Sequence, residues 1–366
     1  MSLKRILMTS DAVGGVWTYS QNLAAALAGY GIQVHLATMG PGPTELQKQQ
    51  LKNLSNLTLH GSSYRLEWMD DPWDDIDRAG DWLLGLEKII KPEIIHLNGY
   101  THGVLPWAVP TCMVAHSCVL SWWEAVRGEQ APAEWTRYRT AVSSGIRNAD
   151  HLIAPTNAML QALRRHYPML PPASVINNGV SANLFSPRQK QAVIFAAGRL
   201  WDAAKNLELL MRCASELPWP VIIAGDGESQ FATTVNVSLL GKVSPQEVAE
   251  HMARASIYCL PARYEPFGLS ILEAALSGCA LVLGDIPSLR ELWNDAAIFA
   301  DPGDQSALLR ALSRLIENAS TRVQLAGAAI ARAQRFSLGK MTNAYVKLYE
   351  QLREPTRRLV QYVEKE

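Results

Sequence analysis

Residues 181–200 read SANLFSPRQKQAVIFAAGRL, and this stretch divides the chain into two parts. Its first half is polar and carries Pro187, whereas residues 193–197 form a short apolar run of the kind that makes a buried parallel strand. Short apolar runs alternate with amphipathic helical stretches before this break, and the same alternation starts again after it. Such alternation is typical of parallel sheets covered by helices.

The expected strands lie at 6–8, 32–37, 94–97, 112–115, 152–154 and 175–176 in the first part, and at 193–197, 221–224, 257–260 and 281–283 in the second. We therefore predict the α/β class, with two Rossmann-like, doubly wound parallel-sheet domains at residues 1–185 and 186–352. A C-terminal helix at about 353–366 is expected to pack back on the first domain. A ligand would lie in the interdomain cleft, at the carboxyl ends of the strands.

Helix starts are marked by two serine–glutamate pairs with the spacing of a capping box, Ser244 with Glu247 and Ser288 with Glu291. Pro245 fits the first helical position after Ser244. Residues 304–318 and 321–352 are expected to form the last helices.

Composition limits the class of protein. The 366 residues are 48% apolar, and 34 Lys and Arg balance 34 Asp and Glu, so no overall positive charge favours a nucleic-acid partner. Five scattered cysteines suit buried thiols in a reducing compartment. The first apolar run is too short for a signal peptide, and no run reaches membrane-spanning length. We expect a cytoplasmic protein without a transmembrane segment, and peripheral membrane contact stays open.

The first strand is followed by SDAVGGV at residues 10–16, and a helix then begins. Gly14 and Gly15 would let the backbone approach a ligand closely, and the start of the helix favours an anion. A tight turn without a ligand explains the pair equally well. Neither a G-x-G-x-x-G fingerprint nor a P-loop motif occurs in the chain, which counts against a nicotinamide oxidoreductase and a P-loop enzyme.

The second domain offers two cations after its first strand, Arg199 and Lys205. Lying on either side of a turn, they can converge on one diphosphate and supply the charge that a metal would otherwise carry. Taken alone, two such cations are more often solvated.

Support comes from EPFGLSILE at residues 265–273, where a glycine-containing loop opens a helix. Free amides near Gly268 and Leu269 would form a second anion site. Glu265 and Glu273 could bind the hydroxyls of a sugar or ribose. Helix capping by Glu265 and a plain surface charge at Glu273 are the alternatives.

These pieces together resemble the family-4 retaining glycosyltransferases of the GT-B fold, over nearly the whole chain. The matching segments are the Gly14-Gly15 loop, Asn178-Gly179-Val180 with Phe185 and Pro187, Gly198-Arg199 with Lys205, Gly225-Asp226-Gly227, Gly241, and the E-x7-E signature from Glu265 to Glu273.

The resemblance implies a sugar nucleotide as donor substrate, held by the second domain, with no cofactor and no metal required. Arg199 and Lys205 would hold the donor diphosphate, with Gly14 and Gly15 bordering it from the first, acceptor-side domain. Glu273 would bind the ribose and Glu265 the transferred sugar. The amides of Phe267, Gly268 and Leu269 would contact the distal phosphate and the sugar.

His116 matches the family's first-domain histidine near the reacting sugar, so we expect it in the active site with Glu265. A histidine satisfied by its own domain is the alternative, and a zinc site from Cys112, His116 and Cys118 fits no common spacing. The acceptor, a carbohydrate or a lipid-linked glycan, would be lined by side chains of the first domain: His96, Asn98, His102, Trp122 and Trp123. Core packing explains the tryptophan pair as well.

A glycosyltransferase that retains configuration is therefore the expected function. A catalytically silent binding subunit of a glycan-assembly complex is one alternative, and an epimerase or phosphorylase on the same fold is another. The sequence does not identify the base and sugar of the donor, the acceptor or the oligomeric state.

Overall fold

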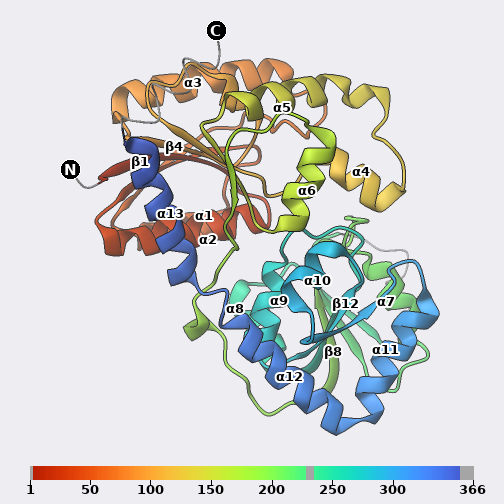
Figure 1. The fold of residues 1–366 in the computed structure, drawn as a ribbon. Helices are drawn as coiled ribbons and strands as arrows, with labels where there is room; N and C mark the ends of the chain where they lie inside the picture. Colours follow the sequence, from red (N-terminus) through yellow and green to blue (C-terminus); the bar gives the residue numbers. More distant parts are fainter. Residues whose placement is uncertain (1–2, 228–234, 355–366) are drawn as a thin grey trace.

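The computed structural model describes residues 3–227 and 235–354 (Figure 1). Within them the chain forms two parallel sheets with helices on their faces, and Figure 1 shows the two units as separate lobes. Each strand run expected from the sequence lies in one of these sheets. Within the described parts of the chain, every helix is too short or too polar to span a bilayer.

The first sheet has the order β3-β2-β1-β4-β5-β6-β7, with all neighbours parallel. Its strands are β1 Arg5–Asp11, β2 Gln33–Met39, β3 Leu57–Gly61, β4 Ile94–Leu97, β5 Thr111–Val114, β6 His151–Ala154 and β7 Ala173–Val175. The helices between them are α1 Gly15–Leu27, α2 Glu45–Lys52, α3 Trp73–Ile90, α4 Val119–Arg127, α5 Thr136–Asn148 and α6 Asn157–His166. Strand order reverses beside β1, so the carboxyl ends of β1 and β4 flank a crevice.

The second sheet has the order β10-β9-β8-β11-β12-β13, again with parallel neighbours. Its strands are β8 Gln191–Ala197, β9 Val221–Ala224, β10 Val237–Gly241, β11 Ala255–Leu260, β12 Ala280–Gly284 and β13 Ala297–Ala300. The helices are α7 Leu207–Ala214, α8 Pro245–Arg254, α9 Leu269–Leu276, α10 Pro287–Trp293, α11 Gln305–Glu317 and α12 Ala319–Ala333. The capping box expected at Ser244 and Glu247 is present at the start of α8.

The last described helix, α13 Leu338–Arg353, belongs to the first domain's core although it follows the second domain in sequence. Tyr345 and Tyr349 are fully buried there among residues of β1 and α1, and Figure 1 shows α13 crossing from one lobe to the other. The helix that packs back therefore begins about 15 residues earlier than expected, and 355–366 of the expected segment lies outside the described residues.

A single helix over 321–352 was expected, and this is wrong because α12 ends at Ala333 and α13 starts anew at Leu338. The side chain of Ser337 caps α13 by accepting a hydrogen bond from the N–H of Lys340. Val180 pairs with Ser337 in an isolated parallel bridge, so the two chain crossings between the domains lie side by side. A methyl group at Gly179 would overlap the carbonyl of Ser337, which explains the glycine of the Asn-Gly-Val segment.

Candidate active site between the two domains

The loop after β8 holds Arg199 and Lys205 at the carboxyl edge of the second sheet. Asp202 accepts a hydrogen bond from Nη2 of Arg199 at 2.7 Å. Burial acts to raise the pKa of Asp202, but the guanidinium opposes it and the pKa is lowered. Asn206 follows in the left-handed region at φ 55° and donates from Nδ2 to two loop carbonyls at 2.9 Å each. These bonds set the path of the loop from one cation to the other.

Lys205 and Glu265 form an ion pair at this edge. Their Nζ and Oε2 atoms lie 2.5 Å apart, and the side chains are 20% and 10% exposed. Ser288 at the start of α10 donates from Oγ to the carbonyl of Glu265 at 2.5 Å. The carboxylate is therefore neither a helix cap nor a solvated charge, and it holds the ammonium group in place beside the cleft.

The loop of residues 261–268 ends at Gly268, which is the N-cap of α9 with φ +85°. A methyl group there would stand 2.6 Å from Cδ1 of Ile271, so both the conformation and the space favour glycine. The side chain of Phe267 is buried against Phe336, and its backbone N–H, expected to contact the donor, donates to Oε1 of Glu265 at 3.4 Å. Leu269 opens the helix, whose first N–H groups point out of its N-terminus toward an anion site.

Glu273 lies on α9, and its side chain is half-buried. Burial raises the pKa of its carboxyl to about 7. Among the hydrogen bonds and ion pairs of the described residues, no partner for this carboxylate is found. A half-buried carboxyl group with a raised pKa and no protein partner makes Glu273 a candidate for a functional site.

The Gly14-Gly15 turn faces these groups from the first domain. Gly14 has φ +70°, and a methyl group on it would stand only 2.8 Å from Nη1 of Arg199. A methyl group on Gly15 would stand 3.9 Å from Cδ1 of Leu269, which is ordinary contact. The two domains therefore meet at Arg199 and at the start of α9.

Further contacts hold the domains together around this point. Thr156 donates from Oγ1 to the carbonyl of Pro266 at 3.0 Å, and Tyr264 Oη accepts from the N–H of Cys118 at 3.1 Å. Glu291 accepts from the N–H groups of residues 157 and 158 at 2.8 Å each, so it caps α6 across the interface. The capping box expected at Ser288 and Glu291 is therefore wrong, because both side chains bind other segments.

His116 follows β5 and lies beside Asn98 and Tyr19 of the first domain. Its Nε2 is 2.7 Å from Oδ1 of Asn98, and its ring packs edge-on against Tyr19 with centroids 4.5 Å apart. Burial lowers the pKa of His116 to about 3, so the imidazole is neutral at physiological pH. His96 is completely buried and bonds to Tyr19, Asn98 and Tyr349, so the expectation that it lines the acceptor is wrong.

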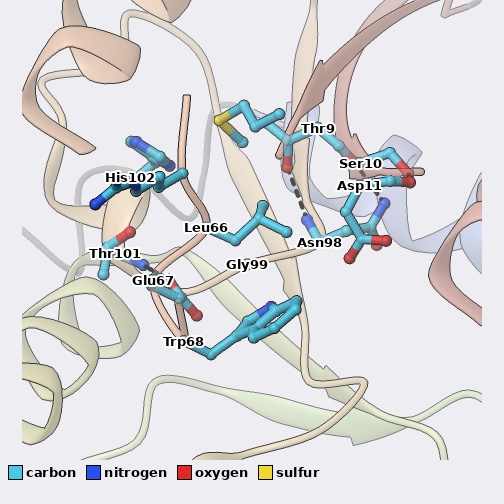
Figure 2. Close-up of a pocket in the computed structure, with 12 residues that line it drawn as sticks. Thr9, Ser10, Asp11, Leu66, Glu67, Trp68, Asn98, Gly99, Thr101 and His102 are labelled. Atoms are coloured by element: carbon cyan, nitrogen blue, oxygen red, sulfur yellow. Dashed lines mark hydrogen bonds between the residues drawn. The ribbon is translucent and has the colours of Figure 1, made fainter. Parts of the chain in front are cut away.

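A pocket opens at the carboxyl ends of β1, β2 and β4, and Figure 2 shows its lining. Asn98 and His102 of the expected acceptor group line it, and Nε2 of His102 lies 3.2 Å from the carbonyl of Ile76. Trp68, 42% exposed, forms part of the wall. The amides of residues 100 and 101 donate to Glu67, which fixes the loop that carries Trp68.

Trp122 and Trp123 are not among the residues that line this pocket. They lie on α4, where their rings meet edge-on with centroids 5.8 Å apart and Arg127 lies 5.9 Å from each ring centroid. The structure gives them packing partners on their own helix.

The proposed zinc set does not form. Cys112 contacts Nδ1 of His96 at 3.5 Å, whereas Cys118 contacts Tyr167 Oη at 3.3 Å. Throughout residues 3–227 and 235–354, no group of three or more His, Cys, Asp or Glu side chains is arranged to hold a metal ion. All five cysteines are buried and free.

Asp11 is a site residue that the sequence analysis assigned no role. It ends β1, lines the pocket, and accepts the N–H of Val13 at 2.8 Å. Burial raises the pKa of its carboxyl to about 6, against the opposing effects of the Val13 hydrogen bond and the charge of Arg199. Its place directly after a strand was the available signal. Glu67 had no comparable signal, because its role depends on two amides more than 30 residues away.

Two family models match the chain, one in each domain. The model described as Glycosyltransferase Family 4 matches residues 13–184, and the one described as Glycosyl transferases group 1 matches residues 191–318. Together they cover the strands of both sheets except β1, and the loops of the site from residue 13 onward.

Relatives and a solved structure agree with these matches. The chain is 31% identical to the O-antigen chain mannosyltransferase B of Escherichia coli over 32% of its own length and 30% of that protein. It is 23% identical to the D-inositol 3-phosphate glycosyltransferase of Corynebacterium diphtheriae over 90% of its length and 87% of the relative. The sucrose-phosphate synthase structure from Thermosynechococcus elongatus superposes with a TM-score of 0.79 at 18% identity, covering 95% of this chain and 99% of the other. That likeness shows the shared fold.

Proposed function

The chain belongs to the family-4 glycosyltransferases of the GT-B fold, and on that premise we propose that it transfers a sugar from a nucleoside diphosphate to an acceptor hydroxyl, with retention of configuration and without a metal ion. One observation carries the proposal. Arg199, Lys205 and the N-terminus of α9 meet at one sheet edge, and the Gly14 turn of the other domain faces them.

The donor would lie along this edge. Its diphosphate would bind between Arg199, Lys205 and the amide end of α9, where positive groups face the space in front of Gly14. Glu273, without a protein partner, would accept hydroxyls of the ribose. Glu265 pairs with Lys205 through Oε2, and its Oε1, which accepts the N–H of Phe267 at 3.4 Å, would also accept a hydroxyl of the transferred sugar.

Cleavage of the bond between sugar and phosphate leaves negative charge on the diphosphate and positive charge on the sugar. The two cations and the helix amides stabilise the leaving charge, so the chain's own residues would take the part of a metal. The acceptor oxygen would attack the anomeric carbon on the face from which the phosphate departs. Its proton would pass to the leaving phosphate oxygen, which balances the step without a protein base.

The acceptor would occupy the pocket of Figure 2. Trp68 supplies an aromatic face for a sugar ring, and Asp11 supplies a carboxylate for hydroxyl groups. The D-inositol 3-phosphate glycosyltransferase among the relatives acts on a polyhydroxylated acceptor according to its name, which supports a hydroxyl-rich acceptor here.

The test is transfer itself. The protein is incubated with UDP-glucose or GDP-mannose and with myo-inositol, methyl glycosides or octyl glucoside, with EDTA present or absent. Mass spectrometry detects products, and proton NMR gives the anomeric configuration. We expect an α-linked product from an α-linked donor in EDTA, and none from Arg199→Ala. A β-linked product would exclude retention, and loss of transfer in EDTA would exclude metal independence. Nucleotide binding without transfer to any acceptor would favour a silent binding subunit.

A further inference from the structure

A chain of polar side chains runs through the first domain and ends at His116. Oη of Tyr349 on α13 lies 2.7 Å from Nδ1 of His96, and Nε2 of His96 lies 3.2 Å from Oδ1 of Asn98. The same Oδ1 lies 2.7 Å from Nε2 of His116. Oδ1 of Asn98 therefore lies within hydrogen-bond distance of two histidine rings.

The orientation of the Asn98 amide follows from its other bonds. Nδ2 lies 2.7 Å from the carbonyl of Thr9 and 3.2 Å from Oγ of Ser20. The backbone N–H of Asn98 also donates to Oγ1 of Thr9, at 2.9 Å, so the residue is held at two points. If the amide were flipped, Oδ1 of Asn98 would face the carbonyl oxygen of Thr9, and two acceptors would meet. The atom that faces His116 is therefore an oxygen, which only accepts.

The proton positions then follow in sequence. Nε2 of His116 must carry a hydrogen in order to bond to Oδ1 of Asn98. Nε2 of His96 lies 3.2 Å from Oδ1 of Asn98 and 3.2 Å from Oη of Tyr19, and a bond to the Asn98 oxygen requires a hydrogen on it as well. Nδ1 of His96 is left to accept the hydroxyl hydrogen of Tyr349. Burial lowers the pKa of both histidines to about 3 and raises that of Tyr349 well above its ordinary value, so the chain carries no charge.

The remaining nitrogen of His116 is Nδ1, and in the neutral ring it bears a lone pair. Within residues 3–227 and 235–354, no hydrogen bond to this atom is found. His116 is half-buried and is not itself a lining residue of the pocket in Figure 2, but its partner Asn98 is, so the ring lies within hydrogen-bond distance of the pocket lining.

We infer that Asn98 is a positioning residue that keeps the proton on Nε2 of His116, so that Nδ1 accepts the hydrogen of a hydroxyl group on the bound sugar. The inference rests on the proposed function for the identity of that ligand. It assigns Asn98 a role other than the acceptor contact expected from the sequence. The inference also predicts which sugars the site accepts. The group opposite Nδ1 must be a hydroxyl that donates a hydrogen bond, so a sugar with fluorine or a methyl ether in that position is rejected.

Other titratable groups around the ring do not disturb this arrangement. Tyr19 from α1 and Tyr345 from α13 face the two histidines, and Cys112 from β5 contacts His96. Burial raises the pKa of each of these three groups, so all stay neutral.

The first test reads the proton directly and needs no activity. Long-range proton–nitrogen NMR spectra of histidine-labelled protein distinguish the two neutral tautomers and the imidazolium, and His116→Gln identifies the signal. At pH 7 we expect the Nε2–H tautomer in the wild-type protein and in Ser20→Ala, which keeps the Oδ1 contact. Asn98→Asp, which retains an oxygen at that position, should keep it too, and Asn98→Leu should give a mixture. An Nδ1–H tautomer or an imidazolium in the wild-type protein overturns the inference.

The second test uses transfer kinetics with a donor series in which single hydroxyls are replaced by fluorine. We expect Asn98→Leu to lower kcat/KM about tenfold with the natural donor, the size of one lost hydrogen bond. The same variant should have little effect with the one fluorinated donor that has already lost the contact. A raised acceptor KM with an unchanged His116 tautomer would instead make Asn98 an acceptor ligand. Absence of transfer with every donor would count against the proposed function, and the NMR result would still decide the tautomer.

Discussion

Removal of the ammonium group of Lys205 tests the second-domain half of the site. In Lys205→Met the apolar stem is kept and the charge is lost, so Glu265 is left 10% exposed without its partner at 2.5 Å. Breaking a buried ion pair from one side costs about 3–5 kcal/mol. Because Lys205 is itself one-fifth exposed, we expect about 2–3 kcal/mol in the free energy of unfolding, measured by urea titration without nucleotide.

The double variant Lys205→Met/Glu265→Gln distinguishes the cost of losing the ion pair from the cost of leaving the Glu265 carboxylate without a partner. It removes both charges and should lose only about 1 kcal/mol relative to the wild-type protein. Calorimetry should show nucleotide affinity about 30-fold lower in Lys205→Met, which is the value of a charge-assisted hydrogen bond of about 2 kcal/mol.

Lys190→Met is the matched control. Lys190 donates to the carbonyls of Met252 and Ser277, so its loss should destabilise the same domain without changing nucleotide affinity. If Lys205→Met were as stable as the wild-type protein and bound the nucleotide equally well, the reasoning about this pair would be refuted.

Three further changes probe the rest of the site. Glu273 has a pKa of about 7 in the fold and 4.5 ordinarily, so the folded state keeps a proton that the unfolded state loses, and stability falls as pH rises through that window. Urea unfolding should therefore show that the free energy of unfolding of Glu273→Gln rises relative to that of the wild-type protein from pH 5 to pH 8. The same pH dependence in both proteins would contradict this. Gly14→Ala should weaken nucleotide binding about tenfold by calorimetry, because its methyl group would meet Arg199, whereas Gly15→Ala has room and should bind normally. Glu291→Gln weakens the cap on α6, so it should lower the free energy of unfolding by about 1 kcal/mol and increase the separation of the domains, as measured by small-angle X-ray scattering. An unchanged scattering profile would show that the cap has no role in closure.

Much of the fold is visible in the sequence because the central strands are buried on both faces. The runs at β4, β8 and β11 are mostly apolar, and this is the pattern that parallel sheets impose; in β1 the apolar run is limited to residues 6–8. The edge strands β3, β10 and β13 were missed: β3 and β10 interrupt their apolar residues with polar ones, whereas the apolar run of β13 is only four residues long and three of these are half-buried.

Local helix signals failed where a distant segment competed for the same groups. The pattern at Ser288 and Glu291 matches a capping box, yet Ser288 binds the carbonyl of Glu265 and Glu291 binds α6. Likewise the break at Ser337 depends on the crossing strand at Val180, which no helical periodicity near residue 337 reveals.

Among the site residues, those that follow strands could be found from order along the chain. Arg199, Lys205 and Glu265 follow strands whose carboxyl ends share an edge, but their roles were predicted only with the resemblance to a known family. Asn98, the partner of His116, also follows a strand, but the partner of His96 on α13 could not be found this way. Tyr349 is 253 residues from His96, and only the return of α13 to the first domain brings them together.

The donor site is tested most directly by thermal unfolding in the presence of UDP, GDP, ADP and their glucose or mannose derivatives, in Mg²⁺ and in EDTA. A ligand at a hundred times its Kd adds about 2.7 kcal/mol of stability. The account predicts that one base raises the midpoint by several degrees in both conditions, and that Arg199→Ala abolishes the shift. No shift with any nucleotide, or the same shift in Arg199→Ala, would contradict a donor site at this edge of the second domain.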